Sequence, residues 1–252
     1  MFRLMSATMM MLVFIRHGQT DWNVEERYQS RLDIPLNDVG RRQAEALKCH
    51  LAGVRFDTAY SSPLRRALET AHIITNDLPI IVDERLAEID HGLWQGRTKA
   101  EIASRWPEQW EQWSREPLGF TAPRGESAAR VRERVEEFLS TIEGKNILCV
   151  SHGVVIQTLL SILLSSLPMK FTLSDPLPPS FDASPYRARA SRAALPLMEG
   201  ETASGASGGG RFRTTQAQPL STRDTYTPAN GSIHTIHFRG RDVCDYRIEQ
   251  IS

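Results

Sequence analysis

The chain has 252 residues, with 30 basic and 30 acidic side chains, 40% hydrophobic residues and three cysteines. This length is sufficient for one sizeable domain, and the balanced charge offers no case for binding to nucleic acid or to a membrane surface. The scattered cysteines, Cys49, Cys149 and Cys244, argue against a disulfide scaffold and indicate a reducing compartment, so we expect a cytoplasmic protein.

The first predicted element is a strand over residues 11–15. The preceding segment loosely resembles a signal peptide, with Arg3 ahead of an apolar stretch, but cleavage after that stretch would remove the strand itself. We therefore expect residues 1–10 to be an untargeted amino-terminal extension.

Directly after this strand comes the most informative motif of the chain, Arg16-His17-Gly18-Gln19-Thr20. The planar guanidinium of an arginine matches phosphate oxygens, an imidazole can attack phosphorus, and a glycine lets the backbone approach a ligand closely. The motif therefore suggests phosphate chemistry at the end of a strand.

A helix over 38–51 and a strand over 58–61 precede a predicted helix at 64–76 that carries an arginine pair. Helix amino termini favour anions, and Arg65 and Arg66 add full positive charge there. Adjacent helical residues point about 100° apart, so the two cannot face the same phosphate. Both lie off the centre of the apolar stripe of this helix, so periodicity alone does not decide between them.

After a strand at 80–82 comes a loop-like segment, residues 83–96, which is dense in carboxylates and can supply a general acid. A helix over 99–113 follows, and the tryptophans of this region either cap the pocket or belong to the core. The next helix covers 127–142, with Glu126 near its start, where a carboxylate suits the helix dipole.

A second motif of the same kind, Ser151-His152-Gly153, ends the strand at 147–150 and leads into a helix at 154–167. Two strands thus deliver two histidines to one edge of a sheet. The alternation of strands and helices predicts an α/β fold, a three-layer α/β/α sandwich with a mostly parallel central sheet. Functional side chains are expected at the carboxyl ends of its strands.

The amino-acid composition of the sequence changes after this helix. Residues 168–229 are rich in proline, glycine, serine, alanine and threonine and lack a periodic apolar pattern, so we expect a low-complexity, disordered insertion. Two strand-like runs in 230–252 are expected to rejoin the domain formed by residues 11–167. Their histidines, His234 and His237, alternate with isoleucines as on an ordinary strand surface, and no spacing in the chain suggests a metal site.

Four segments, in this order, resemble the histidine phosphatase superfamily, also called the phosphoglycerate mutase-like family. They are the R-H-G-x-T motif at 16–20, the S-S-x-L-x-R-A-x-x-T-A motif at 61–71, the E-x-x-x-G-x-x-x-G motif at 88–96 and the S-H-G motif at 151–153. The resemblance runs from about Met11 to Leu167, with a return near Asn230, and its finer features are most similar to the broad-specificity phosphatase branch.

The resemblance implies a phosphatase mechanism that needs no metal or other cofactor. In it, His17 is the nucleophile that forms a phosphohistidine, and Glu88 is first the general acid and then the general base. Arg16, Arg66 and His152 hold the phosphate, with positive charge facing its oxygens. The family pattern thus selects the second arginine of the pair, the one before the alanine.

Substrate contacts beyond the phosphate are expected from Asn23 and Gln29, and Gly18 and Thr20 of the first motif complete the predicted binding set. Ser30 stands where relatives commonly carry glycine, a departure that bears on the shape of this loop.

The sequence favours a phosphomonoester hydrolase that acts on small phosphorylated metabolites. A cofactor-dependent phosphoglycerate mutase is the alternative, although such relatives carry a longer, differently patterned segment after the glutamate motif than residues 94–125 provide. A non-catalytic member that binds phospholigands, with an insertion that recruits proteins, is a third interpretation. The sequence does not identify the metabolite or the oligomeric state.

Overall fold

The computed structural model describes residues 9–76, 78–116, 119–165, 229–239 and 242–250. Of the predicted extension, residues 1–10, only the last two residues are described. Of the predicted insertion, residues 168–229, only the last residue is described. The described chain is built on one six-stranded sheet with the order β3-β2-β4-β1-β5-β6. The strands are β1 (Met9–Arg16), β2 (Thr58–Ser61), β3 (Ile80–Val82), β4 (Asn146–Ser151), β5 (Ser232–Arg239) and β6 (Asp242–Gln250).

The pairing of the strands confirms the predicted, mostly parallel sheet. β1 is parallel to β4, β4 to β2 and β2 to β3, while β5 is antiparallel to β1 and β6 to β5. β2 and β3 have the predicted bounds, and β1 begins at Met9, two residues before the expected start of the domain. Because the four parallel strands run the same way, their carboxyl ends share one edge of the sheet.

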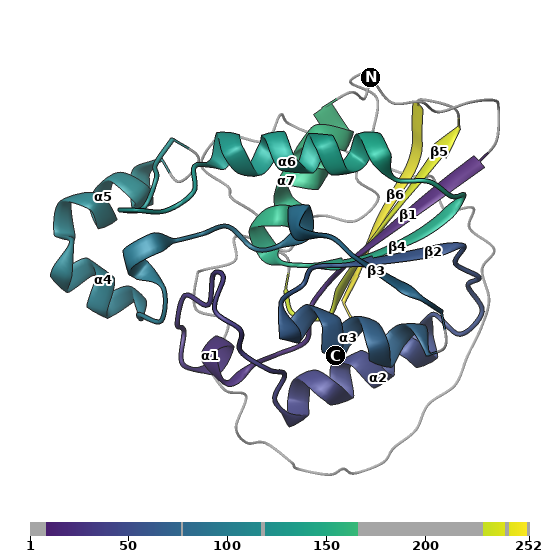
Figure 1. The fold of residues 1–252 in the computed structure, drawn as a ribbon, viewed down its shortest axis with the longest axis horizontal. Coiled ribbons are helices and arrows are strands. Elements are labelled where there is room, and N and C mark those ends of the chain that lie inside the picture. Colours follow the sequence, from purple (N-terminus) through teal and green to yellow (C-terminus); the bar gives the residue numbers. More distant parts are fainter. Residues whose placement is uncertain (1–8, 77, 117–118, 166–228, 240–241, 251–252) are drawn as a thin grey trace, which may run out of the picture.

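Helices cover both faces of the sheet, as the three-layer prediction requires (Figure 1). On one face lie α2 (Asp38–His50) and α3 (Arg65–Thr75), and on the other lie α6 (Ala128–Thr141) and α7 (Gly153–Ser165). Alternate residues of β1 serve the two faces, because side chains point to opposite sides of a strand in turn. Leu12 and Phe14 belong to the core under α6 and α7, and Val13 and Ile15 to the core under α2 and α3.

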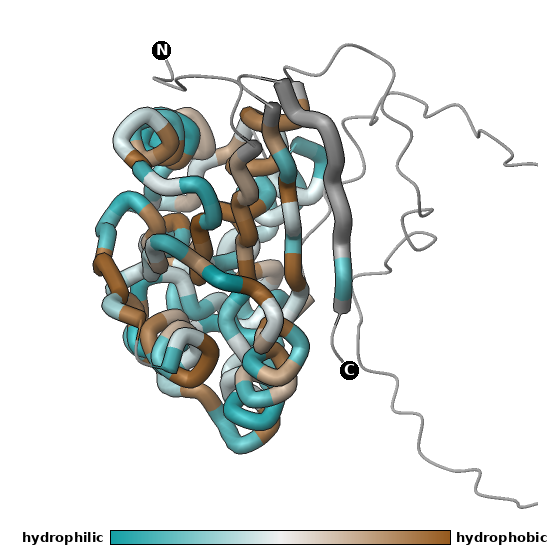
Figure 2. Tube along the Cα trace, turned by 90° about the vertical axis from the view of Figure 1, so that its right-hand side faces the viewer, coloured by the Kyte–Doolittle hydropathy of each residue, from teal (hydrophilic) through white to brown (hydrophobic). Residues whose placement is uncertain are grey.

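The helices begin where the sequence supplies capping side chains. The Asn37 side chain accepts a hydrogen bond from the Gly40 N–H at the start of α2, and the Ser127 hydroxyl accepts one from the Arg130 N–H at the start of α6. Such caps satisfy backbone donors that have no partner within the helix. Apolar residues gather along the strands and the inner sides of these helices (Figure 2).

The helix predicted over 99–113 is two helices, so that prediction was wrong. α4 (Lys99–Arg105) ends at Trp106, and α5 (Pro107–Arg115) begins immediately after it. A proline has no N–H and restricts the residue before it to non-helical conformations, and Trp106 has φ −135° and ψ 63°. Pro107 is therefore well placed as the first residue of a new helix and cannot continue the old one.

A small separate core forms around α4 and α5, the helices on the far left of Figure 1. It contains Ile102 of α4, Trp106 between the helices, and Trp110 and Trp113 of α5. Trp94, from the short turn η2 (Gly92–Trp94), is its fully buried centre and stacks on Phe120 with the ring centroids 5.2 Å apart. Trp110 and Trp113 pack against the same ring. Of the two alternatives for these aromatic residues, the contacts support core packing.

The expectation that His234 lies on an ordinary strand surface was also wrong. This side chain on β5 is fully buried and lies within 3.2 Å of the Ser232 hydroxyl, measured from Nε2. Burial lowers its pKa to about 4. A polar group can occupy a core-facing strand position when it is hydrogen-bonded. The alternation of polar and apolar residues along a strand does not reveal such a bond.

Candidate active site

The five predicted catalytic residues lie where the parallel strands end. Arg16 is the last residue of β1, His17 follows it, and His152 follows β4. Arg66 lies in the first turn of α3, just after β2, and Glu88 follows β3 and the short turn η1 (Glu84–Leu86). Backbone bonds hold this edge together, since the His17 N–H donates to the Ser151 carbonyl at 3.0 Å.

His17 is held as a neutral imidazole with a defined tautomer. Its Nδ1 lies 2.7 Å from the Gly18 carbonyl oxygen, and because a carbonyl only accepts, Nδ1 carries the proton. Nε2 therefore keeps its lone pair. Burial and the positive charges of Arg66 and Arg16 hold the pKa of this imidazole well below its usual range. A buried, unprotonated nitrogen of this kind is a competent nucleophile.

Arg66 brings a buried guanidinium to this nitrogen. Its Nε–H donates to His17 Nε2 at 3.2 Å, while Nη1 and Nη2 donate to the Leu32 and Ser30 carbonyls, both at 2.8 Å. Burial lowers the pKa of Arg66 to about 10, so the group stays charged at neutral pH. Arg65 instead is exposed and pairs with Glu69 at 2.7 Å. The structure thus brings Arg66, and not Arg65, to the predicted nucleophile.

His152 lies beside His17, with the ring centroids 5.1 Å apart. Its Nε2 is 2.7 Å from the Ser62 hydroxyl, which also accepts the Leu64 N–H, and its Nδ1 is buried without a hydrogen-bond partner in the described structure. Burial and the charge of Arg66 lower the pKa of this imidazole well below its usual range. Since buried polar groups are nearly always hydrogen-bonded, the orphaned Nδ1 marks a place for a polar ligand.

Glu88 is oriented by two backbone amides. Its Oε1 accepts the Ile89 N–H at 2.9 Å, and its Oε2 accepts the Val154 N–H at 3.4 Å, at the amino end of α7. The carboxylate is near enough to Arg66 to raise the pKa of that guanidinium against the larger, lowering effect of burial. A partly exposed carboxyl close to Arg66, the arginine predicted to bind phosphate, is suitably placed for proton transfer.

The predicted binding residues differ in whether their polar atoms are already hydrogen-bonded within the protein. Gln29 is buried, and its Oε1 has no hydrogen-bond partner among the described residues. Asn23, by contrast, uses its Oδ1 to accept from both the N–H and the hydroxyl of Thr20, forming the cap of α1 (Asp21–Val24). The Gly18 N–H donates to the Thr70 hydroxyl at 3.1 Å. The substrate contacts of these four residues stay predictions.

Gly18 has a packing role that the motif did not reveal. A Cβ atom at this position would lie 2.5 Å from the Gly40 carbonyl oxygen, so the loop after β1 and the start of α2 touch backbone to backbone. No side chain fits between them.

Glu126 does more than favour the dipole of α6. It accepts from Arg134 Nε at 2.8 Å and lies 3.4 Å from Arg31, and the Glu126 and Arg134 side chains are only 11% and 12% exposed. It also accepts the Asp90 N–H. The carboxylate therefore connects α6 to the segment that carries Glu88.

Two residues of the site were missed as contributors. Asn230 donates through Nδ2 to the His17 and Gly18 carbonyls at 3.0 and 3.3 Å, so the start of β5 fixes the catalytic loop. Ser30, noted only as a departure from glycine, has a positive φ of 50° and hydrogen bonds to both sides of the site. The departure itself was the available signal for Ser30, whereas nothing local in the sequence marks Asn230.

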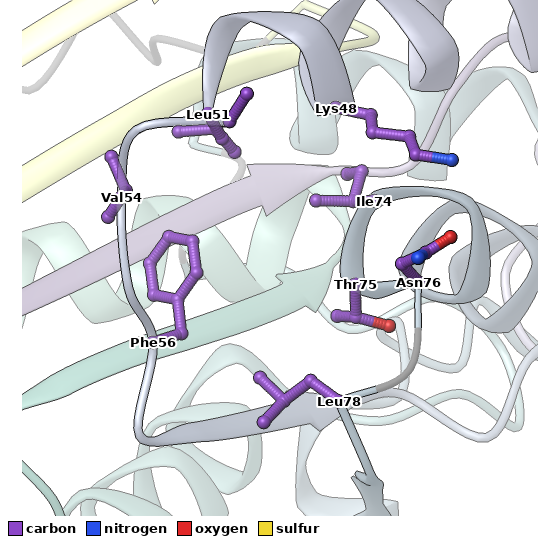
Figure 3. Close-up of a pocket in the computed structure, with 9 residues that line it drawn as sticks. Lys48, Leu51, Val54, Phe56, Ile74, Thr75, Asn76 and Leu78 are labelled. Atoms are coloured by element: carbon purple, nitrogen blue, oxygen red, sulfur yellow. The ribbon is translucent and has the colours of Figure 1, made fainter.

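A pocket of about 380 Å³ lies elsewhere, at the amino ends of β2 and β3 (Figure 3). Its lining is mainly apolar, with Phe56, Ile74 and Leu78 turned toward one another and Lys48 at the rim. It contains none of the predicted catalytic residues. Within the described ranges, no cluster of three or more His, Cys, Asp and Glu residues could hold a metal, and no helix is long and apolar enough to cross a membrane.

Comparison with known proteins identifies the family of the chain. Residues 12–178 match the model of the family described as "Histidine phosphatase superfamily (branch 1)". The chain is 36% identical over 162 residues to "Phosphoserine phosphatase 1" of Hydrogenobacter thermophilus, an alignment that covers 62% of this chain and 77% of that protein. It is 37% identical over 163 residues to "2,3-bisphosphoglycerate-dependent phosphoglycerate mutase 2" of Gloeobacter violaceus, covering 60% of this chain and 74% of that protein.

The same fold occurs among solved structures. The structure described as "Bacillus stearothermophilus YhfR" superimposes with a TM-score of 0.68 at 28% identity, covering 96% of this chain and 98% of that chain.

Proposed function

Because the chain belongs to branch 1 of the histidine phosphatase superfamily, we propose that it hydrolyses small phosphomonoesters through a phosphohistidine formed on His17. The observation that carries this proposal is the buried pairing of His17 Nε2 with Arg66 Nε at 3.2 Å, beside the orphaned Nδ1 of His152. These groups form a preorganised place for a phosphate next to a nucleophile.

In the first half-reaction, His17 Nε2 attacks phosphorus as the bond to the leaving oxygen breaks. Nε2 accepts a hydrogen bond from Arg66, so the arginine must release this nitrogen before the attack. An incoming phosphate offers the guanidinium a charged acceptor, which forms shorter and stronger hydrogen bonds than a neutral imidazole. Binding of the substrate therefore frees the lone pair that attacks it.

Charge on the transferring phosphoryl group is met by Arg16 and Arg66, with His152 as a further hydrogen-bond donor. The buried Arg66 is already fixed by the Leu32 and Ser30 carbonyls, so little reorganisation is needed when the reaction occurs. The two guanidinium groups supply the positive charge that a metal ion supplies in other phosphoryl-transfer sites, and on this basis the reaction is proposed to be metal-independent.

Glu88 gives a proton to the leaving oxygen. In the second half-reaction the same group, now a carboxylate, takes a proton from the water that attacks the phosphohistidine, and inorganic phosphate is released. The backbone amides of Ile89 and Val154 keep the carboxyl oriented in both steps.

The proposal is tested by hydrolysis of an aryl phosphate in the presence of EDTA, with the wild-type protein and with His17→Ala. Turnover by the wild type and its loss in the variant are expected. Undiminished turnover by His17→Ala would contradict the assignment of the nucleophile, and activity that EDTA abolishes would contradict metal independence.

A phosphoglycerate mutase is the second candidate, favoured by the 37% identity to the mutase of Gloeobacter violaceus. A mutase must return the phosphoryl group to a phosphoglycerate, whereas a phosphatase gives it to water. Incubation with 3-phosphoglycerate and bisphosphoglycerate separates the two, since the hydrolase releases inorganic phosphate and a mutase forms 2-phosphoglycerate without net release.

A further inference from the structure

Ser30 connects the two halves of the proposed site. It lies in the loop between α1 and α2 and is only 3% exposed, so water does not readily replace its contacts. Its φ of 50° is in the left-handed region, which is unfavourable for a residue with a side chain. A serine kept in this conformation and buried is therefore a candidate for a specific role.

The hydroxyl of Ser30 is fully engaged by the segment that carries Glu88. It donates to the Ile89 carbonyl at 2.7 Å and accepts the His91 N–H at 2.7 Å. Ile89 in turn donates its own N–H to Glu88 Oε1 at 2.9 Å. The serine hydroxyl thus fixes the peptide unit directly after the one whose N–H orients the carboxyl group.

The backbone of Ser30 reaches the other half of the site. Its carbonyl accepts Arg66 Nη2 at 2.8 Å, and the Nε of the same guanidinium contacts His17. A glycine at this position could hold Arg66 in the same way through its carbonyl, but it could not make the two hydroxyl contacts. The side chain is therefore the part that binds the acid segment to the phosphate-binding arginine.

We propose that Ser30 is a positioning residue that sets the distance from the Glu88 carboxyl to the leaving oxygen, by tying residues 89–91 to the Arg66 and His17 side of the site. This inference rests on the proposed roles of Glu88 and His17. It concerns the Ser30 hydroxyl and its two hydrogen bonds in this chain.

The test compares substrates that differ in their need for a proton. An aryl phosphate such as p-nitrophenyl phosphate releases a stable phenolate, whereas an alkyl phosphate such as glycerol 2-phosphate must receive a proton as its oxygen leaves. The value of kcat/KM reports the steps up to departure of the leaving group, so it isolates the acid role of Glu88 from its later role as a base.

Two variants remove the hydroxyl in different ways. Ser30→Gly suits the positive φ, and Ser30→Ala keeps a Cβ there, so their backbone preferences differ while both lose the same two hydrogen bonds. For both we expect kcat/KM for the alkyl phosphate to fall by about 10- to 100-fold, since a misplacement of roughly 1 Å has effects of this size. The aryl phosphate should change by less than about 3-fold, as should inhibition by inorganic phosphate.

Ser140→Ala is the control, because this serine is exposed on α6 and its hydroxyl bonds only within that helix among the contacts described. An alkyl-to-aryl ratio that stays at the wild-type value in both Ser30 variants would overturn the inference. Equal losses on both substrates with weakened phosphate inhibition would also overturn it, since the effect would then pass through Arg66. If the wild type turned over neither substrate, the proposed function would fail, which is a separate outcome.

Discussion

A single proton decides what His17 can do. The Gly18 carbonyl places that proton on Nδ1, and the two neighbouring arginines oppose the addition of a second one at Nε2. Nε2 therefore keeps its lone pair, which accepts the hydrogen bond from Arg66 Nε. The same arginines that oppose protonation of His17 also provide positive charge that attracts anions.

We expect the free protein to keep His17 neutral when the pH falls through 6.5, the ordinary pKa of histidine. Burial and the adjacent Arg66 and Arg16 lower its pKa, so protonation should occur only at distinctly lower pH. A titration of ring nitrogen shifts by ¹⁵N NMR, assigned with His17→Gln, measures this directly. A His17 midpoint at or above about 6.5 would contradict the expectation.

Arg66→Lys should lower kcat/KM by about 10²- to 10³-fold, because a lysine cannot hold two carbonyl oxygens and a phosphate with one planar fork. Arg65→Lys is the matched control, because Arg65 is next to Arg66 in the sequence but is exposed and pairs with Glu69 on the surface. Steady-state kinetics and thermal unfolding are measured for both variants. Similar kinetics in the two variants would refute the assignment of Arg66.

For single residues, the sequence predicted which residues lie together in the candidate site, but it did not predict all of their contacts. The choice of Arg66 over Arg65 needed the family pattern, because both lie off the apolar stripe of α3. The Ser30 hydroxyl bonds to Ile89, 59 positions away, and the Asn230 side chain bonds to Gly18, 212 positions away. Such partners are set by the way the loops meet, which no local pattern contains.

Among the elements, α2 and the loop after β1 meet backbone to backbone at two glycines, Gly18 and Gly40. A Cβ atom on Gly40 would lie only 2.1 Å from the Gln19 carbonyl oxygen. This glycine is in the first turn of α2, next to the loop that carries His17. The position of the nucleophile therefore depends on a helix residue without a side chain.

Replacement of a helical glycine by alanine usually stabilises a helix by about 1 kcal/mol. For Gly40→Ala we expect the opposite sign, a loss of about 1–3 kcal/mol in the free energy of unfolding, because backbone must move to admit the methyl group. Gly53→Ala is the control, since a Cβ there meets nothing within 4 Å, and a change within about 0.5 kcal/mol is expected. Denaturant unfolding gives both values, and a stabilised Gly40→Ala protein would disprove the packing argument.

The elements themselves were largely predictable, and the exceptions have physical causes. β2 and β3 have their predicted bounds because apolar β-branched and aromatic residues there are bounded by turn residues. The apolar spacing of residues 99–113 continues across Pro107 although the helix does not, and the chain order of the strands does not reveal that β1 lies between β4 and β5. In the first case, the ring of Pro107 ends the helix although the apolar spacing continues. In the second case, the position of β1 is set by the pairing of strands in the folded protein.

For the molecule as a whole, the buried histidines couple stability to pH. The unfolded chain protonates His234 near pH 6.5, whereas the folded protein does so only near its pKa of about 4. The unfolded state thus binds more protons between these values, and stability falls as the pH decreases through this window. His17 and His152, whose pKa values are also lowered, act in the same direction.

His234→Gln should therefore flatten the acid side of the stability profile. The expected difference is up to about 3 kcal/mol in the change of unfolding free energy between pH 6.5 and pH 4. Ser140→Ala, at an exposed site on α6, removes no titratable group and should leave the slope as it is in the wild type. Urea unfolding at closely spaced pH values checks this, and equal slopes in wild type and His234→Gln would show that the buried histidine does not contribute.

The account depends most directly on a covalent phosphate at His17. The decisive measurement is to mix the protein with ³²P-labelled aryl phosphate, quench within milliseconds in base, and locate the label by proteolysis and mass spectrometry. We predict label on His17, stable in base, lost in acid and absent from His17→Ala. Release of phosphate without a labelled protein, or label on any other residue, would contradict the mechanism.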